Sequence, residues 1–247
     1  MKKILLFALF GIIVHLQATE VGTGNTYKPF TYVDEKGKAV GFDVELLEIL
    51  QGYDEELKFN FHPVPFNALF AGLDSNKFDM LAHQIAKTKE REEKYIFSDL
   101  PYFNVMLNII TAKDTKIDTF EELKNKNFGA VVGSNQALRI EEYAKKNPDL
   151  KIKITYFKNY GSQLLALANH QIDALLDNPI VALDYAKSAG VEIKITDLTL
   201  QKTSVYFVFN KQDENLKNRV SKALEKAKED GKLKNLSLKY FGKDYTS

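Results

Sequence analysis

One arginine gives this sequence its most specific chemical signal. An apolar run over 78–86 ends in polar residues, and Thr88 stands three positions before Arg91. This order predicts a strand end, a loop and a helix capped by Thr88, with Arg91 in the first turn. A helix start already carries positive potential and free N–H groups, so an arginine there can share an anion with them. A carboxylate fits its planar fork, and a solvated surface arginine is the alternative left open.

Other chemically capable residues give weaker signals. The chain has no cysteine, and its histidines show no metal-ligand spacing, so we expect no disulfide, no metal site and no cofactor. Asp79 and Asp173 each precede an apolar strand, and we interpret both as structural caps of turns rather than catalytic carboxylates. The four histidines are His15, His62, His83 and His170.

The apolar pattern predicts the elements that must position these residues. Strands are expected near 21, over 57–61 and from 78, and helices open at 41 and 66. The pattern then repeats, with strands over 128–132, 152–157 and 174–176, each followed by a helix. Two further helices are expected over 213–230 and from 233 to about 242. Alternating strands and helices predict an α/β fold with a largely parallel sheet.

An internal similarity predicts two lobes of like construction. Residues 73–81 match residues 167–175 as a helix end, a polar turn and then an apolar residue, Asp, any residue and Leu. Two β-rich runs, 108–112 and 205–210, flank the second lobe and are expected to cross between lobes. Chance similarity of two helix–turn–strand units is the alternative.

Composition and the N-terminus bound the class of protein. The 247 residues carry 34 Lys and Arg against 33 Asp and Glu, a balance that does not suggest nucleic acid as a partner. Lys2 and Lys3, the apolar run over 4–14 and the small residue Ala18 are typical of a cleaved secretory signal. Because no cysteine follows for lipidation, we expect export to a bacterial periplasm; an uncleaved anchor is the alternative.

A set of residues spread over the chain resembles the polar amino acid-binding proteins of bacterial ABC importers, solute-binding protein family 3. Within that family, the cystine-binding members are most similar, through 83–85 and 92–98. The matching residues are Gly22-Thr23, Tyr27, Pro29-Phe30, Gly41-Phe42-Asp43-Val44-Glu45-Leu46, Leu69, Leu73, Phe78-Asp79, Thr88, Glu90-Arg91, Phe97-Ser98, Pro101-Tyr102, Gly133-Ser134, Asp173-Ala174, Gly231, Leu233 and Phe241-Gly242.

The resemblance implies a bilobed type II periplasmic binding protein, with two Rossmann-like lobes joined by two hinge strands. Residues 1–18 would be the signal peptide, 19–108 with 207–247 lobe 1, and 109–206 lobe 2. Such a monomer would capture a small polar amino acid, with cystine the named candidate, and deliver it to a membrane ABC permease. No cofactor is implied.

The resemblance also assigns roles to residues. Arg91 would bind the ligand α-carboxylate, and the aromatic rings of Tyr27 and Phe66 would flank the ligand. Backbone near Gln84 and Ala86 would supply hydrogen bonds. The turn that contains Ser134 and Asn135 would supply more from the other lobe.

Three departures from the family pattern bear on the ligand. Ala86 replaces a Thr or Ser whose hydroxyl binds the ligand in the family. A gap-free match puts Asn178 where the ammonium-binding Asp stands, with Asp177 one residue early, and an Asn cannot neutralise a buried ammonium. Gly24 replaces an acidic residue of members that bind basic amino acids. A lysine or arginine ligand is therefore less expected.

Two other functions remain open from the sequence. Cyclohexadienyl dehydratases resemble the same family, and His83 and Asp177 are the candidate acid or base groups of such an enzyme. No second group at a catalytic spacing supports them. A ligand sensor would bind in the same way but act on a different partner.

Overall fold

The computed structural model describes residues 18–247, and the expected signal peptide lies outside these residues apart from Ala18. Among the described residues, none of the helices combines the length and apolar character that a membrane span needs. Within residues 18–247, eight α-helices accompany one large sheet and one small one, as the α/β prediction requires.

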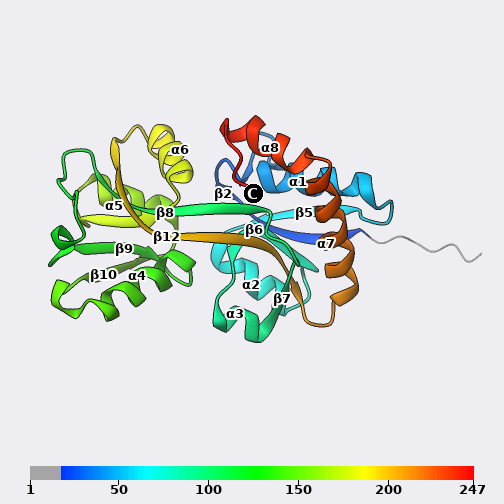
Figure 1. Ribbon diagram of the computed structural model, residues 1–247, viewed down its shortest axis with the longest axis horizontal. Coiled ribbons are helices and arrows are strands. Elements are labelled where there is room, and N and C mark those ends of the chain that lie inside the picture. Colours follow the sequence, from blue (N-terminus) through cyan, green and yellow to red (C-terminus); the bar gives the residue numbers. More distant parts are fainter. Residues whose placement is uncertain (1–17) are drawn as a thin grey trace, which may run out of the picture.

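The elements form two bodies joined by a pair of long strands (Figure 1). Lobe 1 comprises β1 Thr19–Gly24, β2 Thr26–Tyr27, β3 Thr31–Val33, β4 Ala39–Val40, α1 Phe42–Leu50, β5 Phe59–Val64, α2 Phe66–Asp74, β6 Met80–Ala86, α3 Lys89–Lys94, β7 Tyr95–Phe97, α7 Glu214–Glu229 and α8 Lys232–Phe241. Lobe 2 comprises β9 Asn127–Val131, α4 Asn135–Lys146, β10 Lys153–Phe157, α5 Tyr160–Ala168, β11 Ala174–Asp177 and α6 Pro179–Ala189. The joining strands are β8 Phe103–Ala112 and β12 Ile193–Asn210.

The large sheet runs through both lobes in the order β10-β9-β11-β8-β12-β6-β1-β5, and β7 also pairs with β12. Within each lobe the strands that precede helices pair in parallel, β1 with β5 and β6, and β9 with β10 and β11. The β8 and β12 strands pair with their neighbours in the antiparallel sense. Parallel pairing brings the carboxyl ends of several strands in each lobe to one edge, where ligands bind in open α/β sheets.

The internal similarity seen in the sequence is present in the structure as a repeated backbone unit. Asp79 Oδ2 accepts a hydrogen bond from Glu20 N at 2.7 Å, and Asp173 Oδ2 accepts one from Asn127 N at 2.8 Å. In return, Asp79 N donates to Glu20 O and Asp173 N to Asn127 O, both at 2.8 Å. Each Asp therefore ties the start of its strand to the neighbouring parallel strand. The role is structural, as expected, but the carboxylates bond this neighbouring strand and not the turn that they were expected to cap.

Close packing at two glycines follows the same repeat. A Cβ at Gly22 would lie 2.5 Å from the ring of Phe78, and a Cβ at Gly129 would lie 2.4 Å from the side chain of Ile172. In each lobe the apolar residue before the Asp thus packs directly on a glycine of the first strand. The two lobes are built alike at the level of single contacts.

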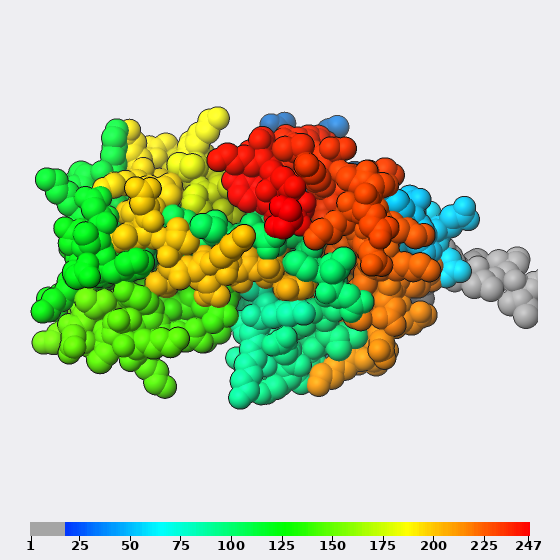
Figure 2. All heavy atoms as spheres, viewed as in Figure 1, coloured from blue at the N-terminus to red at the C-terminus, as the bar shows by residue number. Residues whose placement is uncertain are grey.

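The joining strands are longer than the sequence predicted. The predicted crossing runs, 108–112 and 205–210, cover only one end of β8 and one end of β12, which have 10 and 18 residues. Figure 2 shows the residues of β12 running across the junction of the two lobes on this face. Since β8 and β12 belong to both bodies, the residue numbers that divide the lobes stay a prediction.

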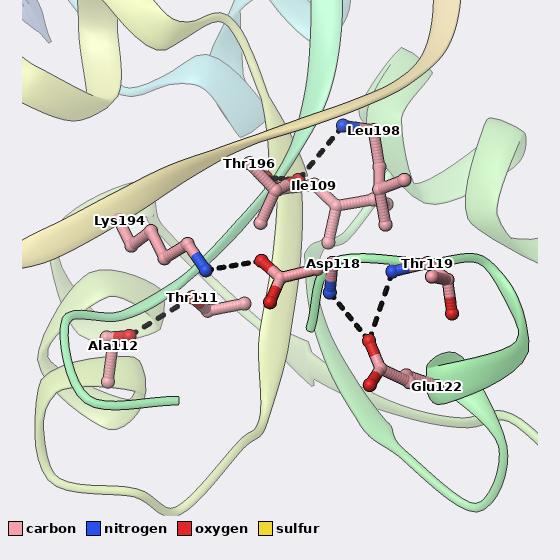
Figure 3. A network of polar contacts seen from close by, with 9 residues as sticks. All are labelled: Ile109, Thr111, Ala112, Asp118, Thr119, Glu122, Lys194, Thr196 and Leu198. Carbon is pink, nitrogen blue, oxygen red and sulfur yellow. Dashed lines mark hydrogen bonds and ion pairs between the residues drawn. The ribbon is translucent and has the colours of Figure 1, made fainter. Parts of the chain in front are cut away.

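A polar network fixes β12 where its pairing with β8 shifts register (Figure 3). The shift falls between Ile195 and Thr199, and Thr196 lies inside it. Thr196 Oγ1 donates to Ile109 O at 2.8 Å and accepts from Leu198 N at 3.2 Å. These two bonds give backbone groups at the irregularity a side-chain partner and fix Thr196 between β8 and β12.

Candidate functional site

The main cavity of the described residues lies between the two lobes, with a volume of about 470 Å³. Residues of both lobes line it, most of them at strand ends, in the loops that follow, or in the first turns of helices. The lining residues are Gly24, Asn25, Thr26, Tyr27, Pro65, Phe66, His83, Gln84, Ile85, Arg91, Val131, Ser134, Asn135, Gln136, Lys158, Asn159, Tyr160, Gly161, Gln163, Leu176, Asp177 and Tyr185.

Arg91 reaches across the cavity from lobe 1 to lobe 2. The predicted cap is confirmed, since Thr88 Oγ1 accepts from Arg91 N at 3.2 Å at the start of α3. The guanidinium donates to Ala86 O at 2.9 Å and to Gly133 O at 3.0 Å, and it lies 4.9 Å from the ring centroid of Phe70. Burial lowers the pKa of Arg91 to about 10, so the group stays charged at neutral pH. A guanidinium has five N–H donors, so an anion can still bind beside the two carbonyls.

Asp177 supplies the opposite charge from lobe 2. It ends β11, is 2% exposed, and its Oδ1 accepts from Tyr27 Oη at 3.3 Å, Gln136 Nε2 at 2.8 Å and its neighbour Asn178 N at 2.6 Å. Burial raises the pKa of Asp177 to about 6, although these hydrogen bonds favour the charged form. A cation that entered the cavity would neutralise this buried carboxylate.

Of the two candidates that the sequence left open for the ammonium site, Asn178 lies away from the main cavity. Its Oδ1 accepts from Ile180 N at 3.0 Å and so caps α6, which leaves the side chain turned into its own helix. Asn178 borders a different, smaller hollow of about 210 Å³ and is absent from the lining of the main cavity. Asp177 is the last residue of β11 and lines the main cavity, whereas Asn178 already belongs to the start of α6.

Ala86 is also not among the residues that line the cavity. Its side chain is buried at 2% exposure, and its carbonyl oxygen is taken by Arg91. Its role here is to orient the guanidinium.

The start of α4 brings three more residues to the cavity. Ser134 caps the helix through Oγ, which accepts from Ala137 N at 3.0 Å, and Asn135 accepts from Arg139 Nε at 3.2 Å. Gln136, which the sequence did not single out, lines the cavity and donates to Asp177. Together with the free N–H groups of the first turn, this helix start offers partners to an anion.

Gln84 has a backbone conformation that few residues other than glycine adopt, with φ at +50°. Asp43 holds it there, accepting from Gln84 N at 3.0 Å and from Gln84 Nε2 at 2.7 Å. The Tyr102 hydroxyl donates to Asp43 at 2.9 Å and accepts from Gln84 N at 2.9 Å. Burial raises the pKa of Asp43 to about 7. This buried network sets the strand end from which Gln84 faces the cavity.

Aromatic rings form much of the remaining wall. Tyr27 and Phe66, which were expected to flank the ligand, both line the cavity, and the His83 ring packs on them at centroid distances of 5.1 and 5.5 Å. Tyr160 and Tyr185 pack edge to face at 4.8 Å on the lobe 2 side, and the sequence analysis missed both. Each is a helix residue, and helical spacing alone gives no sign of a cavity.

Three hydrogen bonds cross from one lobe to the other at the cavity. Arg91 donates to Gly133 O, and Tyr27 donates to Asp177. The Tyr185 hydroxyl donates to Thr26 O. The lobes are therefore in direct contact around the cavity. Among residues 18–247, no group of three or more His, Asp or Glu side chains could hold a metal ion.

Comparison with known proteins gives a consistent result. A family model described as bacterial extracellular solute-binding proteins, family 3, matches residues 19–243. The L-cystine-binding protein TcyK of Bacillus subtilis is 34% identical over 235 residues, which cover 94% of this chain and 86% of that protein.

Two solved structures are similar over almost the whole chain. An ancestral arginine-binding protein bound to arginine has 31% identity and a TM-score of 0.81, covering 92% of this chain and 100% of that one. An ancestral amino acid-binding protein, described as a precursor of cyclohexadienyl dehydratase, has 31% identity and a TM-score of 0.76, covering 91% and 95%.

Proposed function

The chain belongs to the bacterial extracellular solute-binding proteins of family 3, and on this premise we propose that it is a receptor for a small polar amino acid. Its fold is that of a bilobed type II periplasmic binding protein, and its relatives are amino-acid-binding proteins of ABC transporters. The work of such a receptor is to capture a solute and pass it to a membrane permease.

The observation that carries the proposal is a pair of opposite charges on the two sides of one cavity. Arg91 stands on lobe 1 and Asp177 on lobe 2, and both line the space between the lobes. An α-amino acid has a carboxylate and an ammonium on adjacent atoms, so it can satisfy both side chains at once. Such a ligand bridges the lobes, and its binding energy favours the closed arrangement.

We assign the remaining contacts by geometry. The α-carboxylate binds Arg91 and the first-turn N–H groups of α4, whose cap is Ser134. The ammonium binds Asp177. The rings of Tyr27 and Phe66 flank the ligand side chain.

Cystine is the first ligand to test. Relatives that share about a third of the sequence are named L-cystine-binding proteins, and the cavity leaves room beyond a zwitterionic head group. A ligand with a basic side chain is less favoured for two reasons. Gly24 stands where members that bind basic amino acids are expected to carry an acidic residue, and the site already contains the positive charge of Arg91. The proposed cystine specificity thus rests on the relatives together with this charge balance.

The partner and the cellular location follow from the family. We propose a monomer that works with a membrane ABC permease after export by the signal segment over 1–18, without lipidation. The family is described as extracellular, which is consistent with export to a periplasm.

We propose that the chain does not catalyse a reaction. One similar structure is a precursor of a dehydratase, so turnover is the relevant alternative. Burial and the Arg91 charge lower the pKa of His83 to about 3, which makes it a weak base at neutral pH. Incubation with prephenate and with arogenate tests this directly, and product formation would replace the receptor proposal.

A thermal-shift panel tests the receptor proposal itself. Residues 19–247 are unfolded and refolded to strip any bound solute, and their melting temperature is recorded with amino acids, L-cystine, dipeptides and simple carboxylates. A ligand that binds the native state must raise stability by mass action. We expect a shift with one or a few α-amino acids. Shifts with none of them, or only with carboxylates that lack an ammonium, would contradict the proposal.

A further inference from the structure

The imidazole of His83 is a buried group that faces the cavity and has no role in the assignments above. It is 7% exposed, projects from β6 and lies between the rings of Tyr27 and Phe66. The only role that the sequence suggested for its side chain was that of a catalytic acid or base. The residues around His83 indicate a role in ligand binding.

Gly24 is the reason that the ring fits. A Cβ at position 24 would lie 2.2 Å from both Cε1 and Nδ1 of His83, and 2.7 Å from the hydroxyl oxygen of Thr31. Any side chain there would push the imidazole out of its place. Gly24 and His83 therefore form a complementary pair, in which the histidine from β6 fills the space that the end of β1 leaves free.

The hydrogen bond to Thr31 decides which ring nitrogen carries the proton. Thr31 Oγ1 lies 2.7 Å from His83 Nδ1, is fully buried, and has no other hydrogen-bond partner among residues 18–247. If Nδ1–H were the donor, the hydroxyl proton would be buried without an acceptor. The arrangement that satisfies both groups has the hydroxyl donating to Nδ1, which leaves the proton on Nε2.

Nε2 is open to the cavity. It has no hydrogen-bond partner within the described part of the chain, yet it is not among the fully enclosed unpaired atoms, which are Thr23 Oγ1, Gln84 Oε1 and Tyr160 Oη. The accessible space next to this ring is the cavity that His83 lines. Burial, and to a smaller extent the Arg91 charge, lower the pKa of the ring, so it presents one neutral N–H donor.

We propose that His83 is a specificity-determining residue, which donates a hydrogen bond from Nε2–H to an acceptor atom on the side chain of the bound amino acid. This deepens the proposed receptor function and rests on it. The preferred ligands have a side-chain carbonyl, carboxylate or comparable acceptor. An ammonium or guanidinium side chain would meet a donor instead of an acceptor and leave that donor unpaired.

Selectivity between matched ligands tests the proposal. The probes are L-glutamine, which has a side-chain carbonyl, and L-norleucine, a linear side chain of similar length without one, each titrated by calorimetry. The ratio of their affinities in the wild type is compared with the ratio in His83→Phe, which keeps a ring in place and removes the donor. We expect the glutamine preference to fall by about two- to tenfold, the range of one neutral hydrogen bond.

A control and a second measurement make the outcome decisive. His62→Phe replaces a histidine on β5 that pairs with Glu20 outside the cavity, and it should leave the ratio unchanged. Nitrogen NMR of the wild type, with His83 assigned by its loss in His83→Phe, should show the Nε2–H tautomer without titration between about pH 5 and 8. The tautomer and its lack of titration are read from the wild type alone, and the variant serves only to assign the signal.

Each result separates the two proposals. Wild-type binding with an unchanged ratio in His83→Phe, or an Nδ1–H tautomer in the NMR spectrum, would overturn the role of His83 and leave the receptor function standing. Failure of the wild type to bind any amino acid in the panel would overturn both.

Discussion

At the scale of single residues, the proposed site consists of two side chains of opposite charge, Arg91 and Asp177, which bind the oppositely charged groups of one small molecule. Arg91 is already engaged with two backbone carbonyls, one from each lobe, and Asp177 accepts three hydrogen bonds. Both side chains are therefore oriented before a ligand arrives. Preorganised charges in a cavity lose little freedom on binding, which favours affinity.

Replacing Arg91 tests the carboxylate site. We expect Arg91→Ala to weaken amino acid binding by at least about 30-fold, because losing one partner of a buried charge pair costs about 2–5 kcal/mol. Arg91→Lys keeps the charge but lacks the planar fork, so its affinity for the amino acid should lie between those of the wild type and Arg91→Ala. Calorimetry measures the affinities, and circular dichroism checks that both variants are folded. Affinity in Arg91→Ala equal to that of the wild type would refute the assignment.

The pH dependence of binding tests Asp177. Its pKa of about 6 in the cavity means that the carboxylate becomes protonated as the pH falls below that value. An ammonium ligand needs the charged form, so affinity should fall about tenfold between pH 7 and pH 5. In Asp177→Asn the affinity at pH 7 should be lower and this pH dependence should disappear. A wild-type affinity that is constant across this range would count against Asp177 as the ammonium partner.

At the scale of elements, the end of β6 is shaped by a network outside the cavity. Asp43 from the start of α1 and Tyr102 hold Gln84 in a left-handed conformation, so α1 contributes to the site without touching the ligand space. Positions of this kind cost conformational energy and persist because surrounding contacts fix them.

The raised pKa of Asp43 makes a prediction about stability. The pKa of Asp43 is about 7 in the folded state, against about 3.9 for an unperturbed Asp. As the pH rises, the folded protein therefore keeps this proton to a higher pH than the unfolded chain does. The contribution is fully present below the unfolded pKa and is lost as pH rises toward about 7. Urea unfolding should therefore show higher stability at pH 5 than at pH 8 from this group, by about 1–3 kcal/mol.

Asp43→Asn provides the control for that experiment. The amide cannot titrate, so the difference in unfolding free energy between pH 5 and pH 8 should shrink, with Asp177 contributing to what remains because its pKa is also raised. Equal pH dependence in the variant and the wild type would show that Asp43 titrates normally.

How far the sequence could predict these elements depends on how local their signals are. The cap at Thr88 and the alternation of strands and helices follow from local patterns, and the structure has both. Asp79 and Asp173 were expected to cap turns, but their carboxylates bond the backbone of a neighbouring strand that is distant in the sequence, which local patterns do not show. The full lengths of β8 and β12 could not be found, because their polar residues are satisfied by pairing with partners far along the chain.

Only part of the site could be predicted from the sequence, because only some of its residues have a local signal. Arg91, Tyr27 and Phe66 were found by motif, and the structure brings them to one cavity. The choice between Asp177 and Asn178 depended on where β11 ends and α6 begins, and a sequence match that is one residue out exchanges the last strand residue with the helix cap.

At the scale of the whole molecule, β8 and β12 connect the two lobes (Figure 1), and residues of both lobes line the cavity. Relative motion about these two strands would open and close the cavity. The hydrogen bond from Tyr185 on α6 to Thr26 O is one of the contacts that such an opening must break.

Tyr185→Phe should therefore shift the equilibrium toward the open arrangement. The lost hydrogen bond is worth about 0.5–1.5 kcal/mol, so ligand affinity should fall about two- to tenfold. Small-angle X-ray scattering should show a larger radius of gyration for the ligand-free variant than for the wild type. Tyr156→Phe, which removes a hydroxyl bonded to Glu141 within lobe 2, is the matched control. Equal effects of both changes would rule out a closure role for Tyr185.

The most direct test of the account is a calorimetric titration of refolded residues 19–247 with the amino acid that gives the largest thermal shift, beside its N-acetyl and decarboxylated analogues. We predict one binding site for the free amino acid and losses of at least about 30-fold for each analogue, because each leaves one buried charge without its partner. Equal affinity for either analogue would contradict recognition of the zwitterion by Arg91 and Asp177.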